Sequence, residues 1–215
     1  MRLRKIKNAQ ERLKAENNTY YIENPVLYKG KWKSLFNNDN PIHIEIGCGK
    51  GQFMMELSKR NPNINYIAIE KYDSVLLRIL EKAMDDNPSN LKLSVIDAKE
   101  LTNYFADGEV SRIYLNFSDP WPKNAHAKRR LTSKSFLDNY KKILIPYGEI
   151  FQKTDNRGLF EFSIESFNES NFSLSHISLD LHSDYEKYPD NITTEFEDKW
   201  SKLGPIYRLE ARKRD

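Results

Sequence analysis

The chain has 215 residues, 39% of them hydrophobic and 30% charged, which suffices for one core of ordinary domain size. Its single cysteine, Cys48, excludes an intramolecular disulfide and the multi-cysteine zinc sites. No apolar run approaches the roughly 20 residues that cross a bilayer, and the first residues lack the apolar centre of a secretory signal. We therefore expect a soluble, cytoplasmic protein with no membrane association.

The formal net charge of +3 is unevenly distributed along the chain. Residues 1–16 hold six basic and two acidic residues, and the segment from Lys123 to Lys134 holds five basic residues and no acidic one. Such patches favour a polyanion such as nucleic acid, although charge that merely keeps the protein soluble would look the same. We predict a basic, flexible arm over residues 1–25 and one domain over residues 26–215.

Short β-rich runs recur along the chain and alternate with about six helix-like segments. The predicted strands are Ile42–Ile46, Tyr66–Glu70, Leu91–Ile96, Arg112–Phe117, Gly148–Lys153, Phe172–Leu179 and Ile206–Arg212. This alternation predicts an α/β fold with a seven-stranded, mostly parallel sheet and helices on both faces. The final run is polar, and we expect it to lie antiparallel or near an edge; a helical stretch, Thr194–Leu203, precedes it.

The first predicted strand ends in a glycine-rich turn, E-I-G-C-G-K-G, in which Gly47 and Gly49 would let the backbone approach a ligand. Three acids, Glu45, Glu70 and Asp97, lie at or near the carboxyl ends of three successive strands, where α/β sheets bind ligands. Helix capping is the simpler explanation for an acid at such a position, above all for Asp97. Together the carboxylates suit a cationic ligand with a ribose, and S-adenosylmethionine has both features.

The fourth predicted strand leads into S-D-P-W-P-K, which places an acid, prolines and an aromatic residue at an active-site position of such folds. The glycine turn followed by I-E resembles the cofactor site of class I methyltransferases. The longer set L-N-F-S-D-P-W-P-K (115–123), H-A-K-R-R-L-T (126–132), F-Q-K-T-D-N-R-G-L-F (151–160) and T-E-F-E (194–197) closely resembles the bacterial tRNA (guanine-N7)-methyltransferase family. The resemblance runs from roughly residue 28 to residue 212.

This resemblance implies a Rossmann-like class I methyltransferase fold and methyl transfer from S-adenosylmethionine to N7 of the variable-loop guanine of tRNA, without a metal. It implies that Glu45, Glu70, Asp97 and Asp119 line the cofactor site, with Asp119 also the catalytic residue. The implied substrate contacts are Lys123, Asp155, Thr194, Glu195, Phe196 and Glu197. The implied RNA contacts are Ala125, His126, Ala127, Lys128, Arg129 and Arg130. We expect tRNA as the partner, no obligate protein partner, and a monomer or homodimer.

Several alternatives stay open at this point. The string S-D-P-W also fits a methyltransferase that acts on an exocyclic amine, and a non-catalytic RNA-binding module is a rival from another class. For N7 chemistry, Asp119 would either oppose the charge of the methylated base or orient the guanine through its N1–H and amino group. Trp121 is either a wall of the base pocket or a core residue.

Overall fold

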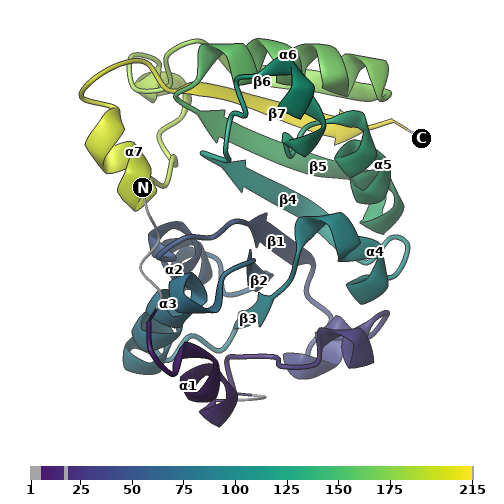
Figure 1. The fold of residues 1–215 in the computed structure, drawn as a ribbon, viewed down its shortest axis with the longest axis vertical. Coiled ribbons are helices and arrows are strands. Elements are labelled where there is room, and N and C mark those ends of the chain that lie inside the picture. The colour runs from purple at the N-terminus through teal and green to yellow at the C-terminus, as the bar shows by residue number, and fades with distance from the viewer. Residues whose placement is uncertain (1–5, 17–18, 215) are drawn as a thin grey trace.

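One seven-stranded sheet organises the part of the chain that this computed structural model describes, residues 6–16 and 19–214 (Figure 1). Its strands are β1 (Ile42–Ile46), β2 (Asn65–Glu70), β3 (Leu91–Val95), β4 (Val110–Asn116), β5 (Leu144–Thr154), β6 (Phe172–Ser178) and β7 (Tyr207–Lys213). Their order across the sheet is β3-β2-β1-β4-β5-β7-β6. The ladders are parallel except on both sides of β7. The predicted mostly parallel sheet is therefore confirmed.

Two strands differ in detail from the sequence prediction. β5 begins at Leu144, directly after the preceding helix, and not at Gly148. Pro146 and Gly148 suggest a turn in the sequence, but the chain stays in the sheet because the backbone bulges at Tyr147, whose φ is 57°. β7 is antiparallel, as expected, yet it lies inside the sheet, hydrogen-bonded to β5 on one side and β6 on the other.

Helices cover both faces of the sheet, as predicted (Figure 1). The crossover helices α2 (Gln52–Arg60) and α3 (Asp73–Asp86) pack with β2 and β3 in one apolar cluster, whereas the isoleucines of β1 belong to the other cluster. The helices α4 (Leu101–Tyr104), α5 (Lys134–Ile143) and α6 (Arg157–Glu169) follow β3, β4 and β5, and all three pack in the other cluster. In α5 the buried residues Phe136, Leu137, Tyr140 and Ile143 follow helical spacing, so one side of the helix faces the core.

A short helix near the N-terminus, α1 (Ala9–Ala15), packs against α3. Ala9 and Leu13 are buried there, and Arg12 Nη2 pairs with Glu81 Oε1 at 2.9 Å. This helix lies within the arm predicted over residues 1–25, of which residues 1–5 and 17–18 fall outside the described part. The boundary between arm and domain stays a prediction.

The last helix, α7 (Glu195–Trp200), lies beyond the carboxyl ends of β4 and β5 (Figure 1). It is shorter than the predicted stretch Thr194–Leu203 and begins where the Thr194 hydroxyl accepts the Glu197 N–H at 3.0 Å. Among the described residues, no helix combines the length and the apolar character needed to span a membrane.

Candidate active site

The glycine turn after β1 contains two kinds of glycine. Gly47 and Gly49 have φ values of 79° and 56°, and a Cβ on either would meet no atom within 4 Å. Gly51, with φ 83°, is different, because its Cβ would lie 2.4 Å from the Ile79 side chain of α3. Gly51 therefore serves the packing of α2 on α3, whereas Gly47 and Gly49 leave an open cradle at the carboxyl end of β1.

Glu45 is buried immediately before this cradle. The Asn116 amide donates to its Oε1 at 2.8 Å, and its Oε2 has no hydrogen-bond partner among the described residues. Burial raises the pKa of Glu45 to about 8, against the opposing effects of Asn116 and Lys153. A buried, unpaired carboxyl oxygen beside an open space is the expected partner of a cationic ligand group.

Glu70 ends β2, Asp97 follows the end of β3, and both residues contact Lys71. Glu70 accepts the N–H groups of Lys71 at 2.8 Å and of Tyr72 at 3.3 Å, and burial raises its pKa. Asp97 pairs with Lys71 Nζ at 2.8 Å, and this contact lowers the pKa of Asp97 although burial opposes it. Asp97 also accepts the Lys99 N–H at 3.1 Å, so it does cap the 3₁₀ helix Ala98–Glu100.

The acids predicted at three strand ends and in the loop after β4 are close enough for their charges to affect one another's pKa values. The charge of Asp119 raises the pKa of Glu70, and the charges of Glu195 and Glu70 raise the pKa of Glu45. Asp155 reaches the same edge of the sheet because Asn116 of β4 and Lys153 of β5 are register partners. The acids at the carboxyl edge therefore lie within electrostatic reach of one another, an arrangement that suits a cationic cofactor.

The loop after β4 holds Asp119 between two strained residues. Phe117 and Trp121 have φ values of 51° and 41°, a left-handed conformation that costs about 1–3 kcal/mol for such a side chain. The Phe117 N–H donates to the Lys153 carbonyl at 2.8 Å, which ties the start of the loop to β5. Asp119 itself is exposed.

Three consecutive cations predicted as RNA contacts occupy different environments. Lys128 and Arg129 are exposed, and the Arg129 guanidinium lies 4.9 Å from the Trp121 ring centroid. Arg130 is buried: its guanidinium donates to the carbonyls of Pro120 and Trp121, each at 3.1 Å, and lies 4.4 Å from the Phe162 ring of α6. Arg130 thus holds the loop that carries Asp119.

The remaining predicted RNA contacts belong to the same loop. They lie in the 3₁₀ helix Asn124–Arg129, which follows the exposed Lys123. The His126 ring meets Trp121 edge-on at 5.8 Å, and its backbone N–H donates to the Lys123 carbonyl at 2.8 Å. Ala125 and Ala127 complete the helix without polar side-chain groups.

The T-E-F-E segment contains two residues that fix α7 in place. Thr194 caps the helix, and Glu197 is fully buried with its Oε2 2.5 Å from Lys153 Nζ. Glu195 Oε1 accepts from Lys82 Nζ at 2.7 Å and from the first N–H of α2, that of Gln52, at 3.2 Å. Phe196 is left exposed.

Sequence reasoning missed two residues of this network, Asn116 and Lys153. Both are polar residues that lie within apolar strand runs, which was the available signal. Asn116 is the partner of Glu45, and Lys153 is the buried partner of Glu197. Their roles depend on strand register, which places them beside acids that are distant in the sequence.

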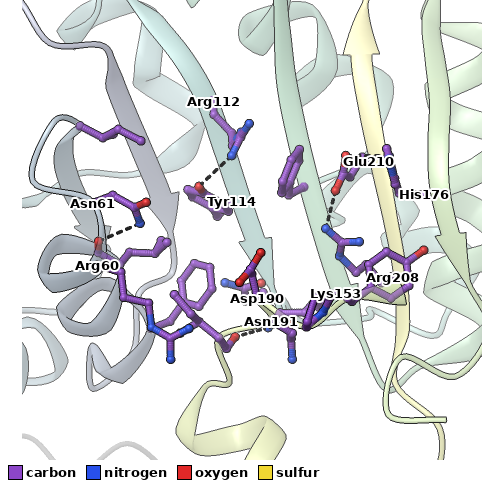
Figure 2. Close-up of a pocket in the computed structure, with 18 of the residues that line it drawn as sticks. Arg60, Asn61, Arg112, Tyr114, Lys153, His176, Asp190, Asn191, Arg208 and Glu210 are labelled. Carbon is purple, nitrogen blue, oxygen red and sulfur yellow. Dashed lines mark hydrogen bonds and ion pairs between the residues drawn. The ribbon is translucent and has the colours of Figure 1, made fainter. Parts of the chain in front are cut away.

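A cavity of about 600 Å³ lies against β4, β5 and β7 next to α2 and residues 187–192, and it shares Asn116 and Lys153 with this network (Figure 2). Tyr114 and Phe151 line its floor. Figure 2 shows Arg112 beside Tyr114 and Arg208 paired with Glu210. The cavity does not include the glycine cradle or the acids at the carboxyl edge. Among the described residues, no group of His, Cys, Asp or Glu has an arrangement that would hold a metal ion.

The chain was compared with known proteins once this geometry was defined. A family described as "Putative methyltransferase" matches residues 39–209. The chain is similar to a KamB 16S rRNA methyltransferase structure, with a TM-score of 0.66, 13% identity, and 86% of this chain and 94% of that one covered. A structure titled as an antibiotic-related methyltransferase gives a TM-score of 0.62 at 15% identity, covering 85% and 92% of the two chains. These structural matches establish the class I methyltransferase fold.

Sequence relatives are much closer. A tRNA (guanine-N(7)-)-methyltransferase of Geobacillus sp. (strain WCH70) is 53% identical, covering 99% of this chain and 96% of the relative. One of Streptococcus agalactiae serotype III (strain NEM316) is 54% identical, covering 99% of this chain and 100% of the relative. Because the identity exceeds one half over nearly the full length of both chains, this chain belongs to the tRNA (guanine-N(7)-)-methyltransferase family.

Proposed function

We propose that the chain transfers a methyl group from S-adenosylmethionine to N7 of the variable-loop guanine of tRNA. The observation that carries the cofactor assignment is the open cradle at Gly47 and Gly49 beside the buried, unpaired Oε2 of Glu45. The family membership of the chain supports the assignment of the reaction.

The residues at the carboxyl edge fit this cofactor. A Cβ at Gly47 or Gly49 would fill the space into which the cofactor must fit. Glu45 would hold the ammonium group, Glu70 the ribose hydroxyls, and Asp97 would lie on the adenine side. When bound, S-adenosylmethionine supplies an activated methyl group. Because no step of this reaction calls for a metal, we expect none.

The residues of the chain would align the guanine with the methyl group and stabilise the positive charge that develops on the base. Guanine N7 has a free lone pair at neutral pH, so no strong base is needed. Asp119, held on the edge of the sheet by the Phe117–Trp121 loop, would either oppose the positive charge that develops on the base or accept hydrogen bonds from its N1–H and amino group. Asp155, which follows the neighbouring strand β5, would contact the same base.

The RNA would be held by exposed cations beside this loop. Lys123, Lys128 and Arg129 are exposed and would contact phosphates, whereas Arg130 would act by positioning the loop. N7 lies on the major-groove edge of guanine, which is inaccessible in A-form RNA, so the target must be an unstacked loop nucleotide.

The decisive experiment measures methyl transfer from labelled cofactor to unmodified tRNA and to the same tRNA with 7-deazaguanine at the target position. The two substrates differ only at N7, so transfer should be lost with the second, and mass spectrometry of the digested product should identify 7-methylguanosine. Methylation of an exocyclic amine would refute the N7 assignment, and the absence of any transfer would favour a binding module.

Two substitutions of Asp119 separate its two candidate roles. If charge dominates, Asp119→Asn and Asp119→Ala should both lower the single-turnover rate by about 10²- to 10³-fold. If orientation dominates, Asp119→Asn should keep part of the activity, because it retains one acceptor oxygen. A wild-type rate for Asp119→Ala would exclude both roles.

A further inference from the structure

Three aromatic rings lead outward from the active-site loop to the surface of α7. The ring centroids of Phe117 and Phe196 lie 4.8 Å apart, and those of Phe196 and Trp200 lie 5.5 Å apart with an interplanar angle of 27°. We name Phe117, Phe196 and Trp200 the aromatic ladder. It begins two residues before Asp119 and ends on a helix beyond the carboxyl ends of β4 and β5 (Figure 1).

The outer two rings of the aromatic ladder face solvent, although rings of this size are normally buried. Phe196 is 39% exposed and Trp200 is 36% exposed. The inner ring is held at a cost, because Phe117 keeps a φ of 51° where it packs on Phe196. The aromatic ladder is also rigidly supported, since the fully buried Glu197 ties the same helix to Lys153.

Two lysines lie beside the outer rings, at the end of a helix whose first turn carries three acids. Lys199 Nζ lies 5.1 Å from the Trp200 ring centroid, and Lys202 follows on the exposed surface. Lys199 is in cation–π contact with Trp200, whereas the charge of Lys202 also acts on Asp198, whose pKa is lowered mainly by Gln52 and Thr193 and further by Lys202. Two acids of α7 are already engaged, Glu195 by Lys82 and Asp198 by the Gln52 amide at 2.7 Å.

We propose that the aromatic ladder is a stacking platform for an unstacked nucleobase that neighbours the target guanine. Single-stranded RNA is recognised by stacking bases on exposed aromatic rings, with nearby cations on the phosphates. Because the aromatic ladder starts beside Asp119, a base stacked on it would belong to the same RNA strand that enters the active site. This position favours RNA over a second copy of this chain. The proposal rests on the proposed function and adds a subsite that selects an extruded strand over a helical one.

The test begins with the outermost ring. Trp200→Ala should weaken equilibrium tRNA binding by about 5- to 150-fold, the range for loss of one base–aromatic stack. Trp200→Tyr should restore most of the affinity, because it keeps an aromatic face. Leu203→Ala is the matched control, since Leu203 is apolar and 71% exposed nearby but belongs to no ring contact. Cofactor binding and the unfolding midpoint should match wild type in all three variants.

Salt dependence distinguishes stacking from charge. Trp200→Ala should leave the slope of log K against log[salt] unchanged, whereas Lys199→Ala should reduce its magnitude by roughly 0.7–0.9 if that lysine meets a phosphate. A tRNA with an abasic nucleotide beside the target guanine should bind wild type as weakly as normal tRNA binds Trp200→Ala. Combining the abasic site with Trp200→Ala should add little, because both remove the same contact.

Unchanged tRNA affinity in a folded Trp200→Ala variant would overturn the proposal. So would affinity losses from Trp200→Ala and from an abasic nucleotide that add in full, whichever side of the target guanine carries the abasic nucleotide. A wild-type dimer that Trp200→Ala dissociates, with unaltered RNA affinity, would assign the aromatic ladder to self-association instead. Binding and methyl transfer are measured separately. Loss of the proposed reaction would appear as bound tRNA without 7-methylguanosine, whereas failure of the stacking proposal would appear in the binding arm alone.

Discussion

Replacing Arg130 with alanine should slow the methylation step without removing an RNA contact. In the sequence Arg130 looks like its neighbours Lys128 and Arg129, but its guanidinium donates to the carbonyls of Pro120 and Trp121 and packs on Phe162. The variant therefore tests whether the loop that carries Asp119 needs an internal clamp.

The expected magnitude follows from these contacts. The guanidinium makes contacts of 3.1 and 3.4 Å from Nε and 3.1 Å from Nη2. Hydrogen bonds from a charged donor contribute about 1.5–3 kcal/mol each. In the alanine variant, water would replace part of them at the two carbonyl groups. A net loss of about 2–4 kcal/mol is comparable with the strain held at Trp121. If this free energy is lost from the equilibrium between the aligned and the misaligned loop, the single-turnover rate drops about 30- to 1000-fold.

The assay is a single-turnover rate at saturating cofactor and tRNA, paired with tRNA affinity across a salt series. Arg130→Ala should lower the rate and leave the salt slope unchanged, and Arg130→Lys should recover only part, since one ammonium cannot reach both carbonyls equally well. Arg129→Ala, the adjacent control, should flatten the slope by roughly 0.7–0.9 while keeping the saturated rate. A normal rate with a flattened slope for Arg130→Ala would refute the clamp.

Three further outcomes are expected. Below about pH 8, wild-type cofactor affinity should rise up to tenfold per pH unit as pH increases. The raised pKa of Glu45 keeps its carboxyl group protonated in the free protein, and binding of a cationic group releases this proton. Calorimetry should find no such proton release in Glu45→Gln. Glu70→Ala should weaken cofactor binding but leave tRNA affinity within a few-fold, and unchanged cofactor affinity would remove Glu70 from the site. Leu13→Ala should cost about 2–5 kcal/mol in urea denaturation, since Leu13 is fully buried under α3; no loss would mean that α1 is an unpacked arm.

Much of the framework can be predicted from the sequence because its signals are local. The apolar strand runs, the glycine turn and the acids at the strand ends each require only a few consecutive residues. Parallel topology then brings the carboxyl ends of β1, β2 and β4 to one edge. Glu45, Glu70 and Asp119 were therefore predictable as a group before any contact was known.

The environment of individual polar residues was not predictable in the same way. Lys128, Arg129 and Arg130 are similar in sequence, and the third one is buried where it meets Phe162 from α6 and the carbonyls of Pro120 and Trp121. Likewise Glu195 and Glu197 differ because Lys153 comes from β5 and Lys82 from α3. Such distinctions depend on contacts between distant segments, which single-sequence patterns do not contain.

The interior position of β7 constrains the order in which this chain completes its structure during synthesis. β6 is hydrogen-bonded only to β7, and β7 also covers the outer edge of β5. Until Tyr207–Lys213 leaves the ribosome, β6 therefore has no strand to pair with, and β5 exposes an open edge to other nascent chains. A chain without Tyr207–Lys213 would leave β6 unpaired and the outer edge of β5 exposed, so this half of the sheet is protected only once β7 has been made.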